Sequence, residues 1–383
     1  MPAQWRHLVN DEVQSSDDAT FIEELPNDGA LHALFVKVRC QNGATAGRGA
    51  TILDVVDDLR IVTGANEQLF SLIPEELEKW YELMFGRPLE QIWTEVGLAR
   101  QEMVFPILFG RGVYDPNIFL PLDRFREVNF EASYSPVISG TVGFIAGQTS
   151  FDLMALITPG NELLDYKGTL VTRRIKAFTS LASGEDDTEL PPEAIIRNVG
   201  IYAYEAGIEQ NVDITRVQLR DTGRDRGYFD ADWEDLVNIG YKGIVPKIRH
   251  AAHLFMSDAD SWTTRLGNIE AYALTVHEDQ SILNDEHIVL QADTIDGDRI
   301  VVDAARADLS AGFEDLTANV TDFDIFATAE GKGPGYFGIV PFSWQDDPAG
   351  YQNMADLSKP ILRLTQGAAG ADVRVSIQEL RQF

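Results

Sequence analysis

Apolar and polar positions alternate on both sides of a Pro- and Gly-containing turn in residues 101–134. An apolar run that includes Pro106 and Phe109 precedes a turn that carries Asp115 and Pro116, and a second alternating run follows the turn. Period-2 alternation beside such a turn is typical of half-buried strands. We therefore expect a strand, a turn and a second strand in this segment.

The same order of features returns in residues 337–365. An apolar run that ends at Phe342 precedes a turn with Asp347 and Pro348, and alternation then resumes. One such unit would be an ordinary β hairpin or corner. Two units, about half a chain apart, predict a duplicated β domain.

Two further blocks support the duplication. Residues 58–83 predict a strand, a polar turn, a short strand and a helix, because Pro74 and the acids after it suit the first turn of a helix. Residues 214–239 show the same order at an offset of 156 residues. The apolar segment 31–38 likewise matches the one that begins at Ile195. Three blocks in one order in both halves predict two tandem β-sandwiches.

The predicted boundaries follow from polar stretches. Residues 1–28 are polar and acidic and are expected to form an N-terminal arm. Residues 29–180 then form the first sandwich and residues 181–383 the second, with a junction in the Ser-, Asp- and Pro-rich segment 180–193. The helices expected at equivalent places are Pro74–Met84 and Asp230–Gly240.

Composition narrows the class of protein. A chain of 383 residues, 44% of them hydrophobic, is long enough for two globular domains. No run of 18 or more apolar residues occurs, so no membrane-spanning helix is expected, and the first 18 residues lack the pattern of a secretory signal. Cys40 is the only cysteine, which excludes an internal disulfide and fits assembly in a reducing cytoplasm.

The charge excludes one class of partner. The formal net charge is −30, and eight lysines occur beside 23 arginines. Binding to nucleic-acid phosphates needs stripes of Lys and Arg, so no direct nucleic-acid binding is expected. An acidic, lysine-poor surface suits high ionic strength, and codon bias of the host explains it equally well. Either way, many copies pack side by side only with salt or metal ions present.

No catalytic or metal-binding pattern stands out. His250 and His253 could face one way on a helix, but no acidic third ligand lies at a suitable spacing. Residues 293–298 fail the EF-hand register and instead suggest an acidic hairpin turn, and residues 331–335 lack the P-loop spacing. Neither a nucleophile elbow nor an HExxH motif occurs. The sequence therefore predicts no catalytic residue, no bound metal and no cofactor.

Two β-rich halves, each with a helix after its second block, resemble the double jelly-roll major capsid proteins of tailless icosahedral viruses. That family includes tectivirus-like and corticovirus-like phages and aquatic relatives. Residues 104–134, 198–207 and 353–380 carry the resemblance, which covers about residues 31 to 380. It implies an all-β fold with short helices, in which two tandem jelly-roll β-sandwiches form a double jelly roll.

The resemblance also implies a function. In that family three subunits close into a pseudo-hexagonal trimer, and trimers tile an icosahedral shell over an internal lipid membrane. Implied partners are further copies of the chain, penton or vertex proteins and minor capsid proteins, in a virion assembled in the host cytoplasm. No active site is implied, and residues 137–157 and 241–283 would be insertions. Trp5, Leu8 and Val9 on the arm would face the membrane or a neighbouring subunit.

Two other classes remain open. A two-domain β-sandwich that binds carbohydrate, such as a virion spike or lectin-like module, would place aromatic residues at loop tips, and Trp93, Trp262 and Trp344 are candidates. A β-sandwich hydrolase acting on polysaccharide would need a pair of carboxylates, and nothing singles out a pair among the 61 acids. Particle size separates these classes, because the capsid hypothesis alone predicts trimers and shells.

Overall fold

A computed structural model of the protein shows mainly β-strands with a few short helices, which confirms the predicted fold class. The structure describes residues 2–383 apart from 45–49, 93–96, 161–163, 206–209, 240–245, 257–260, 266–268, 278–292, 295–298, 304–322 and 344–345. Within these ranges, side chains are described except at residues 210, 251–327 and 332. No helix in these ranges has the length and apolar run needed to cross a bilayer.

The first jelly roll is a sandwich of two antiparallel sheets. One sheet has the strand order β1-β10-β3-β7-β6, and the facing strands have the order β2-β9-β4-β5. This division of eight main strands between two sheets is the jelly-roll arrangement. The elements are β1 (Gln4–Val13), β2 (Ala19–Glu24), β3 (Ala30–Gln41), β4 (Val56–Thr63), β5 (Gln68–Leu72), α1 (Pro74–Phe85), β6 (Gln91–Ile92), β7 (Arg100–Leu108), β8 (Leu120–Pro121), β9 (Val128–Tyr134) and β10 (Ser150–Thr158).

The second jelly roll repeats this order. Its sheets are β11-β25-β13-β22 and β12-β24-β14-β15. The elements are β11 (Thr169–Thr179), β12 (Gly184–Glu189), β13 (Ile195–Tyr204), α2 (Gln210–Asp213), β14 (Ile214–Asp221), β15 (Arg226–Asp232), α3 (Trp233–Ile239), β22 (Phe337–Pro341), β23 (Gln352–Asn353), β24 (Pro360–Gln366) and β25 (Asp372–Arg381). The helices α1 and α3 follow equivalent strands, as the duplication predicts.

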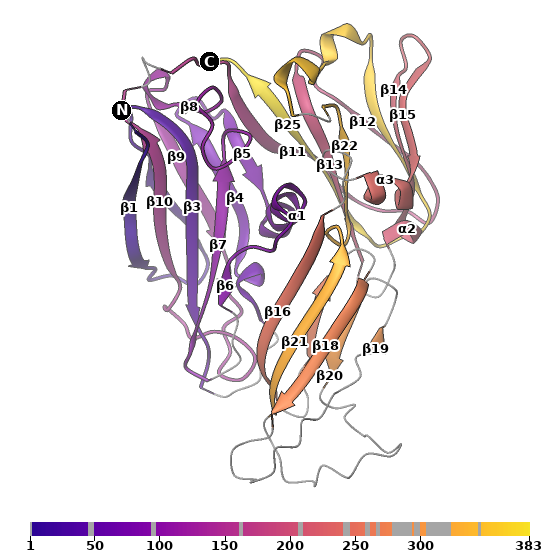
Figure 1. The fold of residues 1–383 in the computed structure, drawn as a ribbon. Helices are drawn as coiled ribbons and strands as arrows, with labels where there is room; N and C mark the ends of the chain where they lie inside the picture. Colours follow the sequence, from indigo (N-terminus) through magenta and orange to yellow (C-terminus); the bar gives the residue numbers. More distant parts are fainter. Residues whose placement is uncertain are drawn as a thin grey trace.

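The two rolls share one continuous sheet. Strand β5 of the first roll pairs in parallel with β11 of the second, through Phe70 with Thr172 and Ser71 with Arg173. The resulting strand order is β2-β9-β4-β5-β11-β25-β13-β22. Figure 1 shows the rolls side by side with α1 between them.

A long insertion separates α3 from β22. It holds a sheet of order β16-β21-β18 and a second sheet of order β17-β20-β19, which project from the lower end of the molecule in Figure 1. The strands are β16 (Lys247–Met256), β17 (Ser261–Arg265), β18 (Ile269–His277), β19 (Asp293–Thr294), β20 (Arg299–Asp303) and β21 (Phe323–Lys332). The antiparallel pairing of β19 with β20 agrees with the predicted hairpin. The described strands within residues 241–283, which are β16, β17 and β18, therefore belong to an insertion, as predicted, and nearly all other residues of that range lie outside the description. Residues 137–157 are not an insertion, because β10 pairs with both β1 and β3.

Two boundary predictions are wrong. Residues 1–28 are not an arm, because β1 pairs with β10 and β2 pairs with β9. The rolls do not meet at residues 180–193 either, since β11 already belongs to the second roll and β12 pairs with β24. The connection between the rolls is residues 159–168. Both errors concern edge strands, which expose most of their side chains and so lack an apolar pattern.

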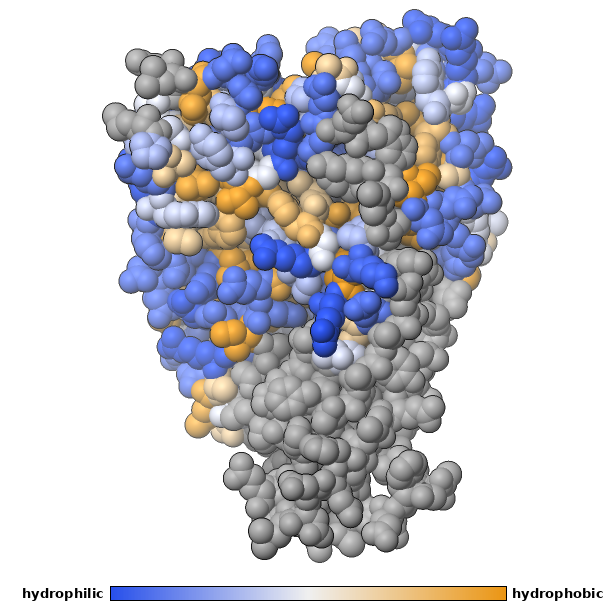
Figure 2. All heavy atoms as spheres, in the orientation of Figure 1, coloured by the Kyte–Doolittle hydropathy of each residue, from blue (hydrophilic) through white to orange (hydrophobic). Residues whose placement is uncertain are grey.

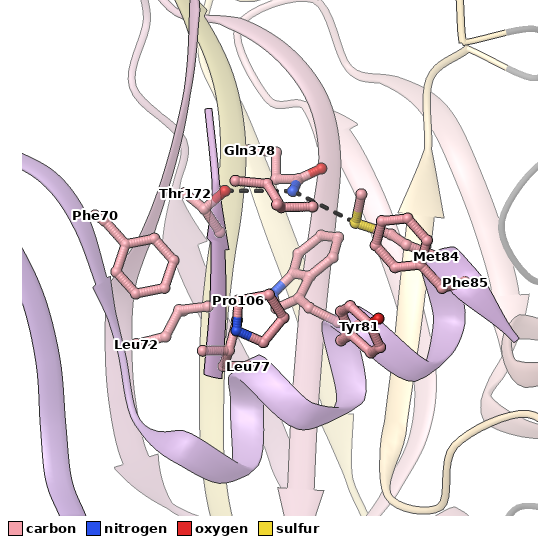
Figure 3. A pocket seen from close by; sticks show the side chains of 11 residues that line it. Phe70, Leu72, Leu77, Tyr81, Met84, Phe85, Pro106, Thr172 and Gln378 are labelled. Carbon is pink, nitrogen blue, oxygen red and sulfur yellow. Dashed lines mark hydrogen bonds between the residues drawn. The ribbon is translucent and has the colours of Figure 1, made fainter. Parts of the chain in front are cut away.

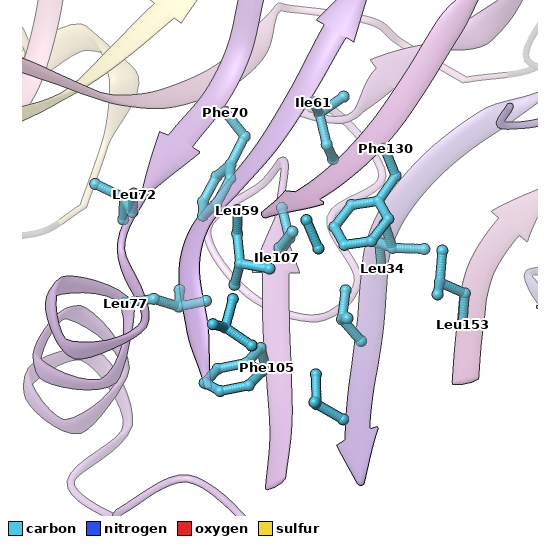
Figure 4. Packing of buried hydrophobic residues seen from close by; sticks show 14 of the residues in the cluster. Leu34, Leu59, Ile61, Phe70, Leu72, Leu77, Phe105, Ile107, Phe130 and Leu153 are labelled. Atoms are coloured by element: carbon cyan, nitrogen blue, oxygen red, sulfur yellow. The ribbon is translucent and has the colours of Figure 1, made fainter. Parts of the chain in front are cut away.

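The cores form where alternating side chains of facing sheets meet. Along β3, Val36 and Val38 are buried, whereas Phe35 and Lys37 are only half-buried and face outward. Leu34, Leu59, Ile61, Phe70, Leu72, Leu77, Phe105, Ile107, Phe130 and Leu153, drawn from both sheets and from α1, interdigitate in the first core (Figure 4). The second roll has a separate core. Figure 2 shows that apolar side chains also reach the outer surface, where they lie among polar ones.

Candidate functional site

The helix α1 joins the two rolls at their contact. Pro74 occupies its first turn, and Gly86, with φ 68°, ends it in the left-handed conformation that suits glycine. Leu77 packs into the first core, whereas Trp80 reaches the outer face of the second roll. The helix is therefore buried on two sides and fixes one roll against the other.

Trp80 of α1 contacts three strands of the second roll. Its indole Nε1 donates to Ser376 Oγ on β25 at 3.0 Å, and its ring meets Phe337 of β22 edge-on with centroids 5.3 Å apart. Gly200 on β13 lies directly under the ring, because a Cβ there would be 2.5 Å from Trp80 Cζ2. The absence of a side chain at Gly200 lets the helix approach the sheet closely.

A cavity of about 20 Å³ remains beside Trp80. Gln378 closes it from β25, with its Nε2 3.3 Å from Thr172 Oγ1 and 3.9 Å from Met84 Sδ (Figure 3). Its other lining residues are Phe70, Leu72, Leu77, Tyr81, Phe85, Pro106 and Leu108. A space of this size holds about one water molecule. It is a packing gap between the rolls and has no room for a substrate.

The other side of α1 carries buried charges. Lys79 Nζ lies 2.9 Å from Glu82 and 3.1 Å from Glu78, and Glu82 also contacts His250 Nε2 of β16 at 2.7 Å. Burial alone would raise the pKa of Glu82, but Lys79 and His250 hold that pKa below its ordinary value. This network links α1 to the first strand of the insertion, so helix, rolls and insertion meet at one point.

Glu76 is a second buried acid on α1. Its side chain is fully buried, and its nearest cation is Arg174 of β11 at 3.5 Å. Burial raises the pKa of Glu76 to about 7, although Arg174 opposes the shift. The Oε2 atom accepts from the backbone N–H of Ile73 at 3.3 Å, whereas the buried Oε1 has no hydrogen-bond partner. The sequence places Glu76 in the first turn of a helix, but it gives no sign of the second roll that covers it.

The residues of the repeated blocks have structural roles. In the first roll, Pro106 and Phe109 are buried, and Asp115 caps the following turn by accepting from the N–H groups of Asn117 and Ile118 at 3.0 and 3.2 Å. Arg111 Nη2 also donates to Asp115 at 2.9 Å. Each of these contacts orders the connection between β7 and β8.

The second block occupies the equivalent connection, between β22 and β23. Asp347 accepts from the N–H of Ala349 at 3.0 Å and so caps the turn that contains Pro348, while Phe342 packs against the second core. Beside this turn, the buried Arg197 donates two hydrogen bonds to Asp346, at 2.7 and 2.8 Å. The sequence did not reveal this buried ion pair, because its partners are 149 residues apart.

The other sequence candidates do not converge on one site. On β1, Val9 is buried in the first core and Leu8 packs against it, while Trp5 remains 49% exposed. His250 lies on a strand rather than a helix, so the helical spacing considered for His250 and His253 does not exist. Trp93 and Trp344 lie outside the described residues, as do the side chains of Trp262 and His253. Within the described residues, no group of three His, Cys, Asp or Glu side chains could hold a metal.

A wider cleft of about 660 Å³ lies between the rolls near the C-terminal strand. Four of its charged side chains pair with one another: Arg173 Nε lies 2.9 Å from Glu379, and Arg381 Nη1 lies 2.6 Å from Glu67. These pairs tie β11 and the turn before β5 to β25. Most of the charge in the cleft is therefore engaged in ion pairs between strands.

Comparisons with known proteins show the fold. No protein-family model matches the sequence, and no curated protein matches it either. The chain is similar to a solved structure of Sulfolobus Turreted Icosahedral Virus, with TM-score 0.54, 10% identity, and 99% of this chain and 90% of that chain covered. It is also similar to the PBCV-1 virus capsid, with TM-score 0.54, 10% identity and coverages of 99% and 93%. A third similar structure is the major capsid protein of bacteriophage PM2, with TM-score 0.51, 10% identity and coverages of 99% and 98%. The whole chain therefore has the double jelly-roll fold.

Proposed function

We propose that this chain is a major capsid protein, which self-assembles into pseudo-hexagonal trimers that tile an icosahedral virus shell. The observation that carries the proposal is the pair of equivalent jelly rolls, held side by side by one continuous sheet and by α1. Three such chains in a closed ring present six similar lobes, which tile a surface as hexagons do. The likeness in fold to solved capsid structures supports this role.

The physical character of the chain fits a structural role. The contact between the rolls is filled by side chains, and the buried charges of α1 face opposite charges: Lys79 lies beside Glu82, and Glu76 lies beside Arg174 of the second roll. The proposal therefore assigns no catalytic activity to the chain. The net charge of −30 supports a shell that does not bind nucleic acid directly.

The proposed location is the virion, after assembly in the host cytoplasm. The proposed partners are other copies of this chain, vertex or penton proteins, minor capsid proteins and an internal lipid membrane beneath the shell. In purified virions, this chain should be the dominant band on a denaturing gel. Lipid extracted from the same particles in constant proportion to the chain would support the internal membrane, and lipid-free particles would contradict it.

Self-assembly is the decisive test. We expect sedimentation and light scattering of the purified chain to show trimers that persist on dilution, since obligate interfaces bury more than about 2,000 Å². Electron microscopy should show trimers or shells in moderate to high salt. A chain that stays monomeric at every salt and protein concentration would overturn the proposal.

A further inference from the structure

Strand registers place each position of one jelly roll on its equivalent in the other. In the first roll, Phe35 pairs with Met154 and with Pro106; in the second, Gly200 pairs with Ser376 and with Ile339. The third strand of each roll has a register irregularity at the same place, which is His32 in β3 and Arg197 in β13. The two short strands β8 and β23 also pair at matching positions. Phe35 is thus the equivalent of Gly200, and Met154 is the equivalent of Ser376.

The face of the second roll that holds α1 therefore has a counterpart on the first roll. The same registers make Trp5 the equivalent of Thr172. Trp5 pairs with Leu156 and Thr172 pairs with Gln378, and Leu156 and Gln378 occupy equivalent positions. Thr172 is 5% exposed under α1, whereas Trp5 is 49% exposed. Trp5 packs edge-on against Phe35 with ring centroids 5.2 Å apart. The face of the first roll that corresponds to the α1-binding face of the second roll is therefore apolar. No helix of the described part of the chain covers Trp5 as α1 covers Thr172.

A groove extends this apolar face. It has a volume of about 340 Å³ and is lined by Phe35, Val104 and Pro106 on the sheet and by Tyr81, Arg87, Pro88, Leu89 and Glu90 near the end of α1. The face thus combines an exposed indole, a half-buried ring and a hollow beside them. Exposed apolar patches with polar rims mark interaction sites.

The strand edges show which surface would cover this face. Within the chain, β5 pairs in parallel with β11. The equivalent of β5 is β15, since both have a register irregularity at the residue directly before an equivalent phenylalanine, Phe70 or Phe229. The equivalent of β11 is β1. Both β15 and β1 are edge strands among the described residues, each with one neighbour in its sheet, and β15 exposes 45% of Tyr228.

We propose that β15 and α3 of one copy dock on β1 and the Trp5 face of the next copy, repeating between chains the contact that β5 and α1 make within the chain. The partner is a second copy of this chain, and the inference rests on the proposed self-assembly. The register of β5 with β11 sets Phe229 opposite Trp5 of the neighbour, and it sets Asp230, which accepts from Arg216 of its own chain, opposite Arg6. The helix α3 then lies over Phe35 and Met154. Because β15 and β1 are different surfaces, the contact is head-to-tail, and it closes into a ring of three when each subunit is rotated by one third of a turn.

The charges on the helices fit this arrangement. The first turn of α1 carries Glu75 and Glu76, and Glu76 faces Arg174 of β11. The first turn of α3 carries the exposed acids Glu234 and Asp235. By register, the equivalent of Arg174 on β1 is His7, whose side chain is 64% exposed. In the proposed contact, an acidic helix end therefore faces an imidazole where the end of α1 faces a guanidinium.

An engineered disulfide tests the register. In the Trp5→Cys/Phe229→Cys double variant, the paired strands bring the two sulfurs of neighbouring copies within bonding range, which requires Cα atoms about 4.4–6.8 Å apart. Oxidation of the assembled protein should give a covalent trimer as the largest major product on a non-reducing gel. The matched control is Val13→Cys/Phe229→Cys, with its first cysteine at the other end of β1, and it should give no ladder. The native Cys40 is buried and should not contribute.

A second variant reads the same contact without a disulfide. Trp5→Ala should raise the dissociation constant of the trimer at least about tenfold, because a half-exposed indole loses its partner surface. Ile22→Ala is the control, since Ile22 on β2 is 57% exposed and lies outside the proposed contact. Trimers that neither cross-link through residues 5 and 229 nor weaken with Trp5→Ala would overturn this contact and leave the proposed function standing. A wild-type chain that is monomeric would overturn both.

Discussion

Gly200 offers the sharpest test of how the two rolls are held together. A methyl group added by Gly200→Ala would lie 2.5 Å from Trp80 Cζ2 and 2.8 Å from Phe337 Cζ. Ordinary carbon contacts need about 3.5–4.0 Å, so the indole would have to move by about 1 Å. Trp80 cannot move freely, because it is 2% exposed and donates its hydrogen bond to Ser376.

The expected magnitude follows from two opposing effects. Overpacking a filled site lowers the free energy of unfolding by about 1–3 kcal/mol. Replacing glycine by alanine also restricts the unfolded chain, which raises the free energy of unfolding by about 0.4–1 kcal/mol. Gly200→Ala should therefore lower the free energy of unfolding by about 1–2 kcal/mol. Gly227→Ala is the control, because Gly227 also lies in a strand and an added methyl there meets nothing within 4 Å.

A double-mutant cycle isolates the contact. Trp80→Leu alone should cost about 2–4 kcal/mol through the cavity it leaves, but it also vacates the space above Gly200. The double variant should therefore be more stable than the sum of the two single effects predicts, by about 1 kcal/mol or more. Urea unfolding followed by far-ultraviolet circular dichroism measures all four free energies. Additive effects within about 0.5 kcal/mol, or a neutral Gly200→Ala, would refute the close contact of α1 with β13.

The remaining predictions concern charge. Because the folded-state pKa of Glu76 is raised to about 7, the stabilisation linked to its protonated form is lost between about pH 4.5 and 7. Glu76→Gln should reduce this pH-dependent loss of stability. Its free energy of unfolding, measured by urea unfolding between pH 5 and 8, should exceed that of the wild type by about 1–3 kcal/mol; parallel pH profiles would contradict this. Lys79→Met leaves the carboxylate of Glu82 with less compensation and should cost about 3–5 kcal/mol at pH 7; a loss below 1 kcal/mol in the same assay would show that His250 suffices. Trimers and shells should loosen at 0.01 M salt, where charges act over about 30 Å, and light scattering that is constant across a salt series would exclude this.

The sequence predicted the interior of the fold better than its edges. Strands such as β3 and β9 bury every second side chain, so their alternation is visible, and the repeated turns at Asp115 and Asp347 mark equivalent connections. Strand β1 buries only Val9, and β12 buries only Thr188. An edge strand with one inward residue has the composition of a loop, which is why residues 1–28 and 180–193 were misassigned.

The contact between the rolls was hidden for a different reason. Pro74 and the acids after it correctly indicate a helix N-terminus. A helix with Glu76, Lys79 and Glu82 reads as solvent-facing on that side, yet all three are buried by the second roll and by the base of the insertion. Burial by a segment distant in sequence leaves no periodic signal, so neither the network nor the role of Trp80 could be inferred from local pattern.

The position of β25 has a consequence for how the protein is made. This strand lies between β11 and β13, and it pairs with both along nearly its whole length. Roughly 200 residues separate it from β11, so at about 5–20 residues per second a ribosome needs about 10–40 seconds to supply it. During that interval the second roll lacks its central strand, and β11 and β13 cannot share a sheet through it. Translation therefore sets the earliest moment at which a subunit can meet its neighbours, and nascent chains waiting at that stage would be the ones most in need of chaperones.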